Sequence, residues 1–144
     1  MEAPTMGKVL VTAKIENLED LYSVKKGQLP DDQVRRIEVQ DALVDTGATT
    51  LLLPKRMIVA LGLIPLRTRH SRGLGGDFLL HVYGTVRLTI QGRDCALDVG
   101  EIGDEYPVLV GQIPLESLDW VIDPKGRRLI GNPDHGGEWG MDAF

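Results

Sequence analysis

The sequence predicts a closed all-β domain. Apolar residues fall into many short runs rich in β-branched side chains, and turn residues separate these runs at regular intervals. At most two short helices fit between the runs. The chain has 144 residues, of which 42% are hydrophobic and 26% charged, as is typical of a single globular domain. We expect the domain to span residues 1–131 and a loose C-terminal tail to span residues 132–144.

Two strands are expected in the first third of the chain. Residues 9–15 are rich in β-branched side chains, and residues 34–44 become continuously apolar as they approach Asp45, as a strand does when it enters a core. The segment 16–32 between them is polar and carries turn signals, so we expect turns there.

One helix and two hairpins are expected further along. Pro54 and Gly62 enclose a short apolar-periodic stretch, which predicts one or two helical turns. An extended segment at residues 63–66 follows. Gly84 interrupts a long alternating strand and predicts a bulge or bend. The predicted hairpins pair residues 78–90 with 94–99, through a turn at 91–93, and residues 120–123 with 127–130.

Composition and charge exclude several classes of function. The net charge of −5 argues against nucleic acid and anionic membranes as partners. No apolar run reaches the roughly 18 residues of a membrane span, and residues 1–8 have no secretory pattern. Cys95 is the single cysteine, so no internal disulfide requires an oxidising compartment, and we expect a cytoplasmic location. The three histidines have no ligand spacing, so we expect no metal and no cofactor.

The most informative segment is Leu43-Val44-Asp45-Thr46-Gly47-Ala48. Two apolar β-formers deliver a carboxylate to a tight turn, and the glycine allows that turn to be sharp. No Lys or Arg lies within four residues of Asp45, so a carboxylate at this point is costly unless it is functional or well hydrogen-bonded.

The run from Ala42 to Thr50 resembles the active-site motif of aspartic proteases, which is two apolar residues followed by Asp-Thr/Ser-Gly-Ala/Ser. Pepsin-like enzymes carry two copies in a much longer chain. A single copy in a chain of this length resembles the retropepsin-like branch, which includes bacterial members. In that branch two identical chains each contribute one Asp to a shared site. The resemblance therefore implies a retropepsin-like barrel, a homodimer, and hydrolysis of peptide bonds.

Two further matches follow in the order that the family requires. A Gly-rich run, Arg72-Gly73-Leu74-Gly75-Gly76-Asp77, stands where the family has a β-hairpin flap over the substrate. Val108-Leu109-Val110-Gly111 then matches the family's late apolar pair with glycine, which a short helix follows. The resemblance implies that Asp45 is catalytic and that its neighbours support it. The other implied site residues are Thr46, Gly47 and Ala48 in the motif, Gly73, Leu74, Gly75 and Gly76 in the flap, and Val110 and Gly111 in the second motif.

The chain departs from the viral members of the family at two positions. Those members often have an acidic residue just after the motif and an Arg directly after the late glycine, and the two side chains pair. Here Thr49 follows Ala48 and Gln112 follows Gly111, so both halves of the ion pair are absent together. This joint absence suggests that neutral hydrogen bonds replace the ion pair.

Two other readings stay open at the level of sequence. The first is a catalytically inactive dimerisation or peptide-binding module on the same fold. The second is an enzyme that needs processing or a partner, with the polar segment 16–32 or the C-terminal tail shielding the cleft.

Overall fold

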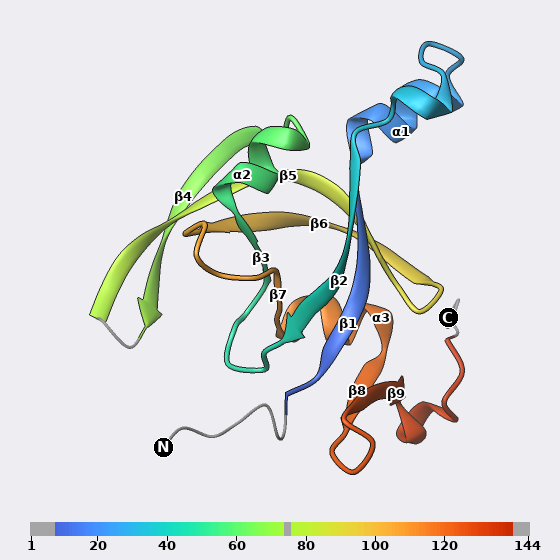
Figure 1. Ribbon diagram of the computed structural model, residues 1–144, viewed down its shortest axis with the longest axis vertical. Coiled ribbons are helices and arrows are strands. Elements are labelled where there is room, and N and C mark those ends of the chain that lie inside the picture. Colours follow the sequence, from blue (N-terminus) through green and yellow to red (C-terminus); the bar gives the residue numbers. More distant parts are fainter. Residues whose placement is uncertain (1–7, 74–75, 140–144) are drawn as a thin grey trace, which may run out of the picture.

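The protein is an all-β structure built on a closed six-stranded barrel (Figure 1). The computed structural model describes residues 8–73 and 76–139; the predicted flap residues Leu74 and Gly75 lie outside the described residues. The strands are β1 Leu10–Asn17, β2 Arg36–Val44, β3 Leu51–Pro54, β4 Ile64–Gly73, β5 Gly76–Ile90, β6 Arg93–Ile102, β7 Leu109–Val110, β8 Trp120–Asp123 and β9 Arg128–Gly131. The helices are α1 Leu18–Lys25, α2 Lys55–Ala60 and α3 Gln112–Leu118, with 3-10 turns at Asp31–Gln33 and Pro133–His135.

The barrel closes because β1 pairs with strands on both sides. Its strand order is β1-β2-β7-β3-β6-β5, and β5 returns to pair antiparallel with β1. β2 runs parallel to β7, and β3 runs parallel to β6. β4 pairs with β5 alone, and these two long strands form the hairpin at the left of Figure 1. β8 and β9 form a separate two-stranded sheet.

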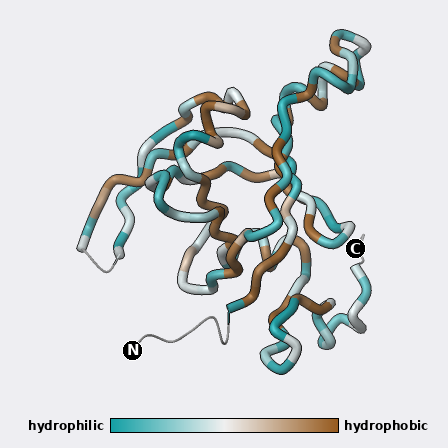
Figure 2. The backbone as a smooth tube through the Cα atoms, in the orientation of Figure 1, coloured by the Kyte–Doolittle hydropathy of each residue, from teal (hydrophilic) through white to brown (hydrophobic). Residues whose placement is uncertain are grey.

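The core fills the inside of the barrel. Alternate residues of the strands face inward, as the period of two requires, and Ile15, Leu51, Leu53, Leu88 and Val99 are fully buried there. Figure 2 shows the hydrophobic residues along the barrel strands, whereas α1 and the turn after it are mostly hydrophilic.

One carboxylate joins the three strands at which the barrel closes. Glu16 on β1 stands opposite Arg36 on β2 and opposite Arg87 on β5. Its side chain is 2% exposed, and its two oxygens accept hydrogen bonds from Arg36 Nε at 2.9 Å and Arg87 Nη2 at 2.8 Å. Burial alone would raise the pKa of Glu16, but the hydrogen bonds from Arg87 and Arg36 outweigh it and lower the pKa. The buried charge is therefore fully paired across the seam.

Most of the strands expected from the sequence are present, and the bulge at Gly84 appears as a register shift between Tyr83 and Val86. The turn at Gln91 and Gly92 has positive φ at both residues, the geometry of a two-residue hairpin. α2 occupies the predicted helical stretch, and α3 follows Gly111 as the resemblance implied.

α1 was not expected, because the polar segment gave turn signals. Asn17 caps this helix by accepting a hydrogen bond from the Asp20 N–H at 3.0 Å. Asp20 is itself buried and binds Arg35 through Nε at 2.9 Å. The extended segment predicted at residues 63–66 is only the start of β4. The rest of this strand was not predicted, because its side chains are almost all exposed and form no apolar pattern.

Part of the predicted C-terminal tail contacts the barrel. Arg93 is buried and donates hydrogen bonds to the carbonyl oxygens of Leu118, Asp119 and Gly137, and its guanidinium stacks on Trp120. Residues 132–139 are thus attached at Gly137, while residues 140–144 lie outside the described part. None of the helices in the described residues has the length and apolarity to cross a bilayer.

Candidate active site

Asp45 lies directly after β2, where the strand leaves the barrel. Its N–H donates to the carbonyl oxygen of Val110 at 2.9 Å, which continues the parallel pairing of Val44 with Val110. Its carboxylate oxygen Oδ1 accepts the N–H of Gly47 at 2.9 Å, and its carbonyl oxygen accepts the N–H of Ala48 at 3.0 Å. The turn therefore orients the carboxylate by local hydrogen bonds, as the Asp-Thr-Gly sequence predicts.

The second motif packs directly behind this loop. Gly111 is buried, and its N–H donates to the carbonyl oxygen of Thr50 at 3.0 Å. A Cβ at Gly111 would lie 2.5 Å from the carbonyl oxygens of both Ala48 and Thr50. Only glycine allows the two backbones to approach so closely. Val110 and Gly111 thus support the Asp45 loop from behind.

Neutral hydrogen bonds connect the loop to the start of α3. The N–H groups of Gln112 and Ile113 donate to the carbonyl oxygens of Ala48 and Thr49, at 2.9 and 2.8 Å. The side-chain Nε2 of Gln112 donates to the carbonyl oxygen of Thr46 at 3.1 Å. The described contacts between the loop and the start of α3 are therefore made by neutral groups.

The β4–β5 hairpin faces the Asp45 loop across a cavity of about 620 Å³. From the loop, Asp45, Gly47 and Ala48 line this cavity; from the hairpin, Gly73 and Phe78 line it. Gly73 stands opposite Gly76 at the end of the hairpin. The structure therefore brings the first motif and Gly73 of the predicted flap to one cavity, whereas Gly76 is exposed and does not line it. Thr46 is exposed beside it.

Several lining residues were not named as site residues from the sequence, although Arg72 and Leu109 belong to the runs quoted for the flap and the second motif. Leu52 on β3, Leu80 on β5 and Leu109 on β7 supply apolar walls, and Ser71 and Arg72 on β4 contribute polar ones. Strand alternation would have grouped Phe78 with Leu80 on one face, but the sequence alone does not say which face meets Asp45.

Asp45 is the one carboxylate among the described residues that line this cavity. Its Oδ1 holds the Gly47 N–H, and no hydrogen bond within residues 8–73 and 76–139 involves its Oδ2. A half-buried carboxylate with one oxygen fixed and the other available can accept a proton or bind water. In the same part of the chain, no group of three or more His, Cys, Asp or Glu is arranged to hold a metal ion.

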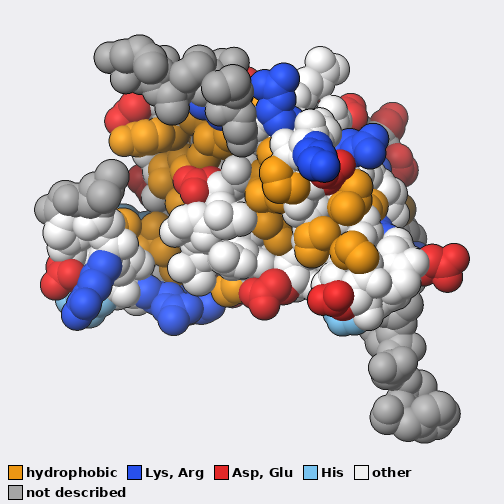
Figure 3. Space-filling model, turned by 90° about the horizontal axis from the view of Figure 1, so that it is seen from below, with side chains coloured by type: hydrophobic (Ala, Val, Ile, Leu, Met, Phe, Trp, Pro, Cys, Tyr) orange, Lys and Arg blue, Asp and Glu red, His pale blue; other side chains and the backbone are white. Residues whose placement is uncertain are grey.

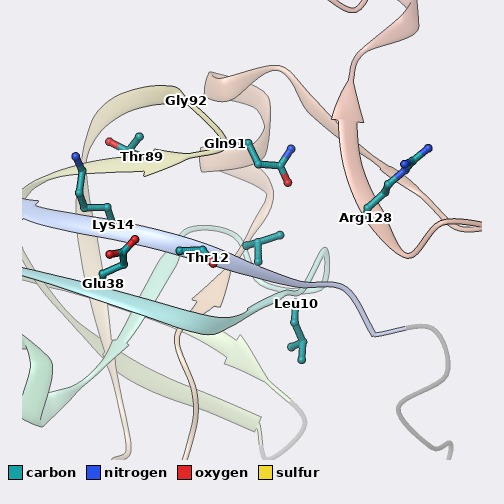
Figure 4. A pocket seen from close by; sticks show the side chains of 9 residues that line it. Leu10, Thr12, Lys14, Glu38, Thr89, Gln91, Gly92 and Arg128 are labelled. Atoms are coloured by element: carbon teal, nitrogen blue, oxygen red, sulfur yellow. The ribbon is translucent and has the colours of Figure 1, made fainter.

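A second groove, of about 460 Å³, lies between the barrel and Arg128 (Figure 4). Lys14, Glu38 and Thr89 on three barrel strands line it, together with Gln91 at the hairpin turn. None of the site residues predicted from the sequence belongs to this groove.

No protein-family model matches the chain, and no relative was found among curated proteins.

Proposed function

We propose that the protein is an aspartic endopeptidase that acts as a homodimer, with one Asp45 from each chain in a shared site. The observation that carries the proposal is the position of Asp45: its carboxylate is oriented by the Gly47 N–H and lines a cavity covered by a hairpin with glycines at its end. The cytoplasmic location expected from the sequence belongs to the same proposal.

The chemistry needs two carboxylates. Two such groups about 3 Å apart cannot both ionise, so the pair holds one proton, as is established for aspartic proteases as a class. The ionised Asp takes a proton from a bound water, whose oxygen attacks the scissile carbonyl carbon. The protonated Asp donates a hydrogen bond to the carbonyl oxygen, and a proton passes to the leaving nitrogen as the C–N bond breaks.

A second copy of the chain is the simplest source of the second carboxylate. Among the described residues, Asp45 is the only acidic residue that lines the cavity. A two-fold axis beside Asp45 would bring the Asp45 of a second copy into the same site. Ile113, which is 45% exposed and hydrogen-bonded to the Asp45 loop, offers an apolar surface for such a contact.

The substrate would be an extended peptide between the loop and the hairpin. Backbone groups near Gly73 and Gly76 could pair with it as an added strand pairs with a sheet edge. Opening and closing of the hairpin would admit the peptide and then exclude water from the dyad.

The test is Asp45→Asn, which keeps a side-chain oxygen for the Gly47 N–H and removes the ionisable group. Asp41→Asn is the matched control, because Asp41 is exposed on the same strand. Both variants and the parent are incubated with a degenerate peptide library between about pH 4 and 7, and fragments are identified by mass spectrometry. We expect Asp45→Asn to lose at least about 100-fold in rate and Asp41→Asn to retain activity.

Equal cleavage by the parent and Asp45→Asn would refute the proposal. Sedimentation of the same samples gives the oligomeric state, and we expect activity to fall on dilution as the dimer dissociates. Peptide binding without cleavage by the parent would favour the inactive peptide-binding module instead.

A further inference from the structure

The cavity at Asp45 does not end at the loop. A second cavity of about 540 Å³ runs under the same hairpin and shares five lining residues with the first. These shared residues are Thr49, Thr50, Ser71, Arg72 and Leu80. The two cavities are therefore one continuous groove, which leads from Asp45 along β4 and β5 towards the base of the hairpin.

The far end of this groove is lined by arginines. Arg67, Arg69 and Ser71 stand at alternate positions of β4, so their side chains share one face of the strand, and all three line the second cavity. Across the hairpin, Arg69 stands opposite Leu80 and Arg67 opposite Val82, and both of these partners also line the groove. The groove is thus lined by apolar side chains of β5 along its length and by Arg67 and Arg69 of β4 towards the base of the hairpin.

One of these arginines already has a carboxylate partner. Arg67 Nη2 lies 2.9 Å from Asp98 Oδ2, and the other oxygen of Asp98 accepts the Thr85 hydroxyl at 2.9 Å. Arg72 Nε lies 3.6 Å from Asp77 Oδ1, with both side chains largely exposed. Arg69 takes part in none of the ion pairs among residues 8–73 and 76–139.

The sign of the charge in the groove is opposite to that of the protein. Arg67, Arg69 and Asp98 line its far part, and Arg72 lines the part that the two cavities share. With Asp45, the groove therefore holds three arginines and two carboxylates, although the whole chain carries a net charge of −5. Figure 3 shows basic side chains around this hairpin, at the left of the view. A positive groove in an acidic protein attracts negatively charged ligands and repels positive ones.

We propose that Arg69 selects peptides that carry an acidic side chain on one side of the scissile bond. The inference rests on the proposed function, because the ligand is the substrate that Asp45 would cleave. Arg69 is two residues from Ser71 and four from Gly73 along β4, and both of these line the Asp45 end. With a rise of about 3.3 Å per residue in both the strand and an extended peptide, the acidic side chain lies about two to four positions from the cleaved bond.

The experiment compares pairs of peptides that differ only by Glu or Gln at each of these positions. kcat/KM is measured for the parent, for Arg69→Gln and for the control Lys125→Gln, which removes the same charge from the exposed turn between β8 and β9. We expect the parent to prefer the best Glu peptide about fivefold, as suits a partly exposed charge pair. Arg69→Gln should bring this ratio close to one, and Lys125→Gln should leave the ratio unchanged.

A binding measurement separates this inference from the proposed function. Fluorescence anisotropy with labelled Glu and Gln peptides is recorded on Asp45→Asn protein, with and without Arg69→Gln. If the parent cleaves neither peptide, but the Glu peptide binds selectively and this selectivity depends on Arg69, the inference is retained and the endopeptidase is rejected. Cleavage that depends on Asp45 but shows no Glu preference, or a preference that survives Arg69→Gln, would overturn the inference and leave the endopeptidase intact. Absence of both cleavage and selective binding would reject both.

Discussion

Replacement of Gly111 by alanine tests whether the second motif holds the Asp45 loop in place. The new methyl group would lie 2.5 Å from two backbone carbonyl oxygens, those of Ala48 and Thr50. Neither oxygen belongs to a side chain that could rotate away. The loop and the start of α3 must therefore separate by roughly 0.5–1 Å.

The cost of this change follows from the contacts. Overpacking at a buried backbone crossing costs about 1–3 kcal/mol. The separation also weakens the hydrogen bonds of the Gly111, Gln112 and Ile113 N–H groups to the loop, each of which contributes about 0.5–1.5 kcal/mol. We expect a total loss of about 3 kcal/mol in the free energy of unfolding, a large part of the 5–15 kcal/mol or so of an ordinary domain.

Urea unfolding followed by circular dichroism measures this loss. With a slope of about 2 kcal/mol per molar, Gly111→Ala should lower the midpoint by about 1.5 M. Gly73→Ala is the control, because a Cβ there would meet only the exposed ring of Phe78, at 3.2 Å, and its midpoint should stay within about 0.3 M of the parent. A Gly111→Ala midpoint as close to the parent as that of the control would show that the loop accommodates a methyl group and that the reasoning is wrong.

Two further predictions concern a partly buried thiol and a buried carboxylate. Burial, together with the charge of Asp94, raises the pKa of Cys95 to about 11; iodoacetamide at pH 8 should therefore label the native thiol about 100-fold more slowly than the unfolded one, and equal rates by mass spectrometry would contradict this. Glu16→Gln should cost about 1–3 kcal/mol at neutral pH, because it removes the charge that Arg36 and Arg87 bind. Since the pKa of Glu16 is lower in the folded state than its ordinary 4.5, its stabilisation is complete above pH 4.5 and is lost as the pH falls through the folded value. The difference in urea midpoint between the parent and Glu16→Gln should therefore disappear at low pH. A difference that persists at low pH would show that packing rather than charge accounts for the loss of stability.

The fold was predictable where the local pattern and the tertiary contacts agree. The alternation in residues 78–90 reflects a strand with one face in the core, and the Gln91–Gly92 turn reflects a backbone preference. The pattern failed at α1 and in most of β4. Asp20 is buried because Arg35, which precedes β2 and is 15 residues further along the chain, pairs with it, and the β4 side chains lie over a groove rather than in the core.

The candidate site divides in the same way. The sequence identified Asp45 and Gly47, because an Asx turn is a local structure that three or four residues specify. It also identified Gly111 as a motif residue, but not why glycine is needed there. The carbonyl oxygens of Ala48 and Thr50 leave no room for a Cβ at this position. Arg69 carried no signal of its own in the sequence, because an arginine on a polar strand is usually only solvated.

By itself, the sequence determined the class of the fold, the positions of most strands along the chain and the turn that presents Asp45, because each of these depends on side-chain period or on the backbone preferences of a few adjacent residues. The tertiary structure alone decided that Glu16 ties both neighbouring strands at the seam, that the second motif supports the first, and that the hairpin turns its arginines into the groove of Asp45. These depend on contacts between residues far apart in the chain, and such contacts exist only once the barrel has closed.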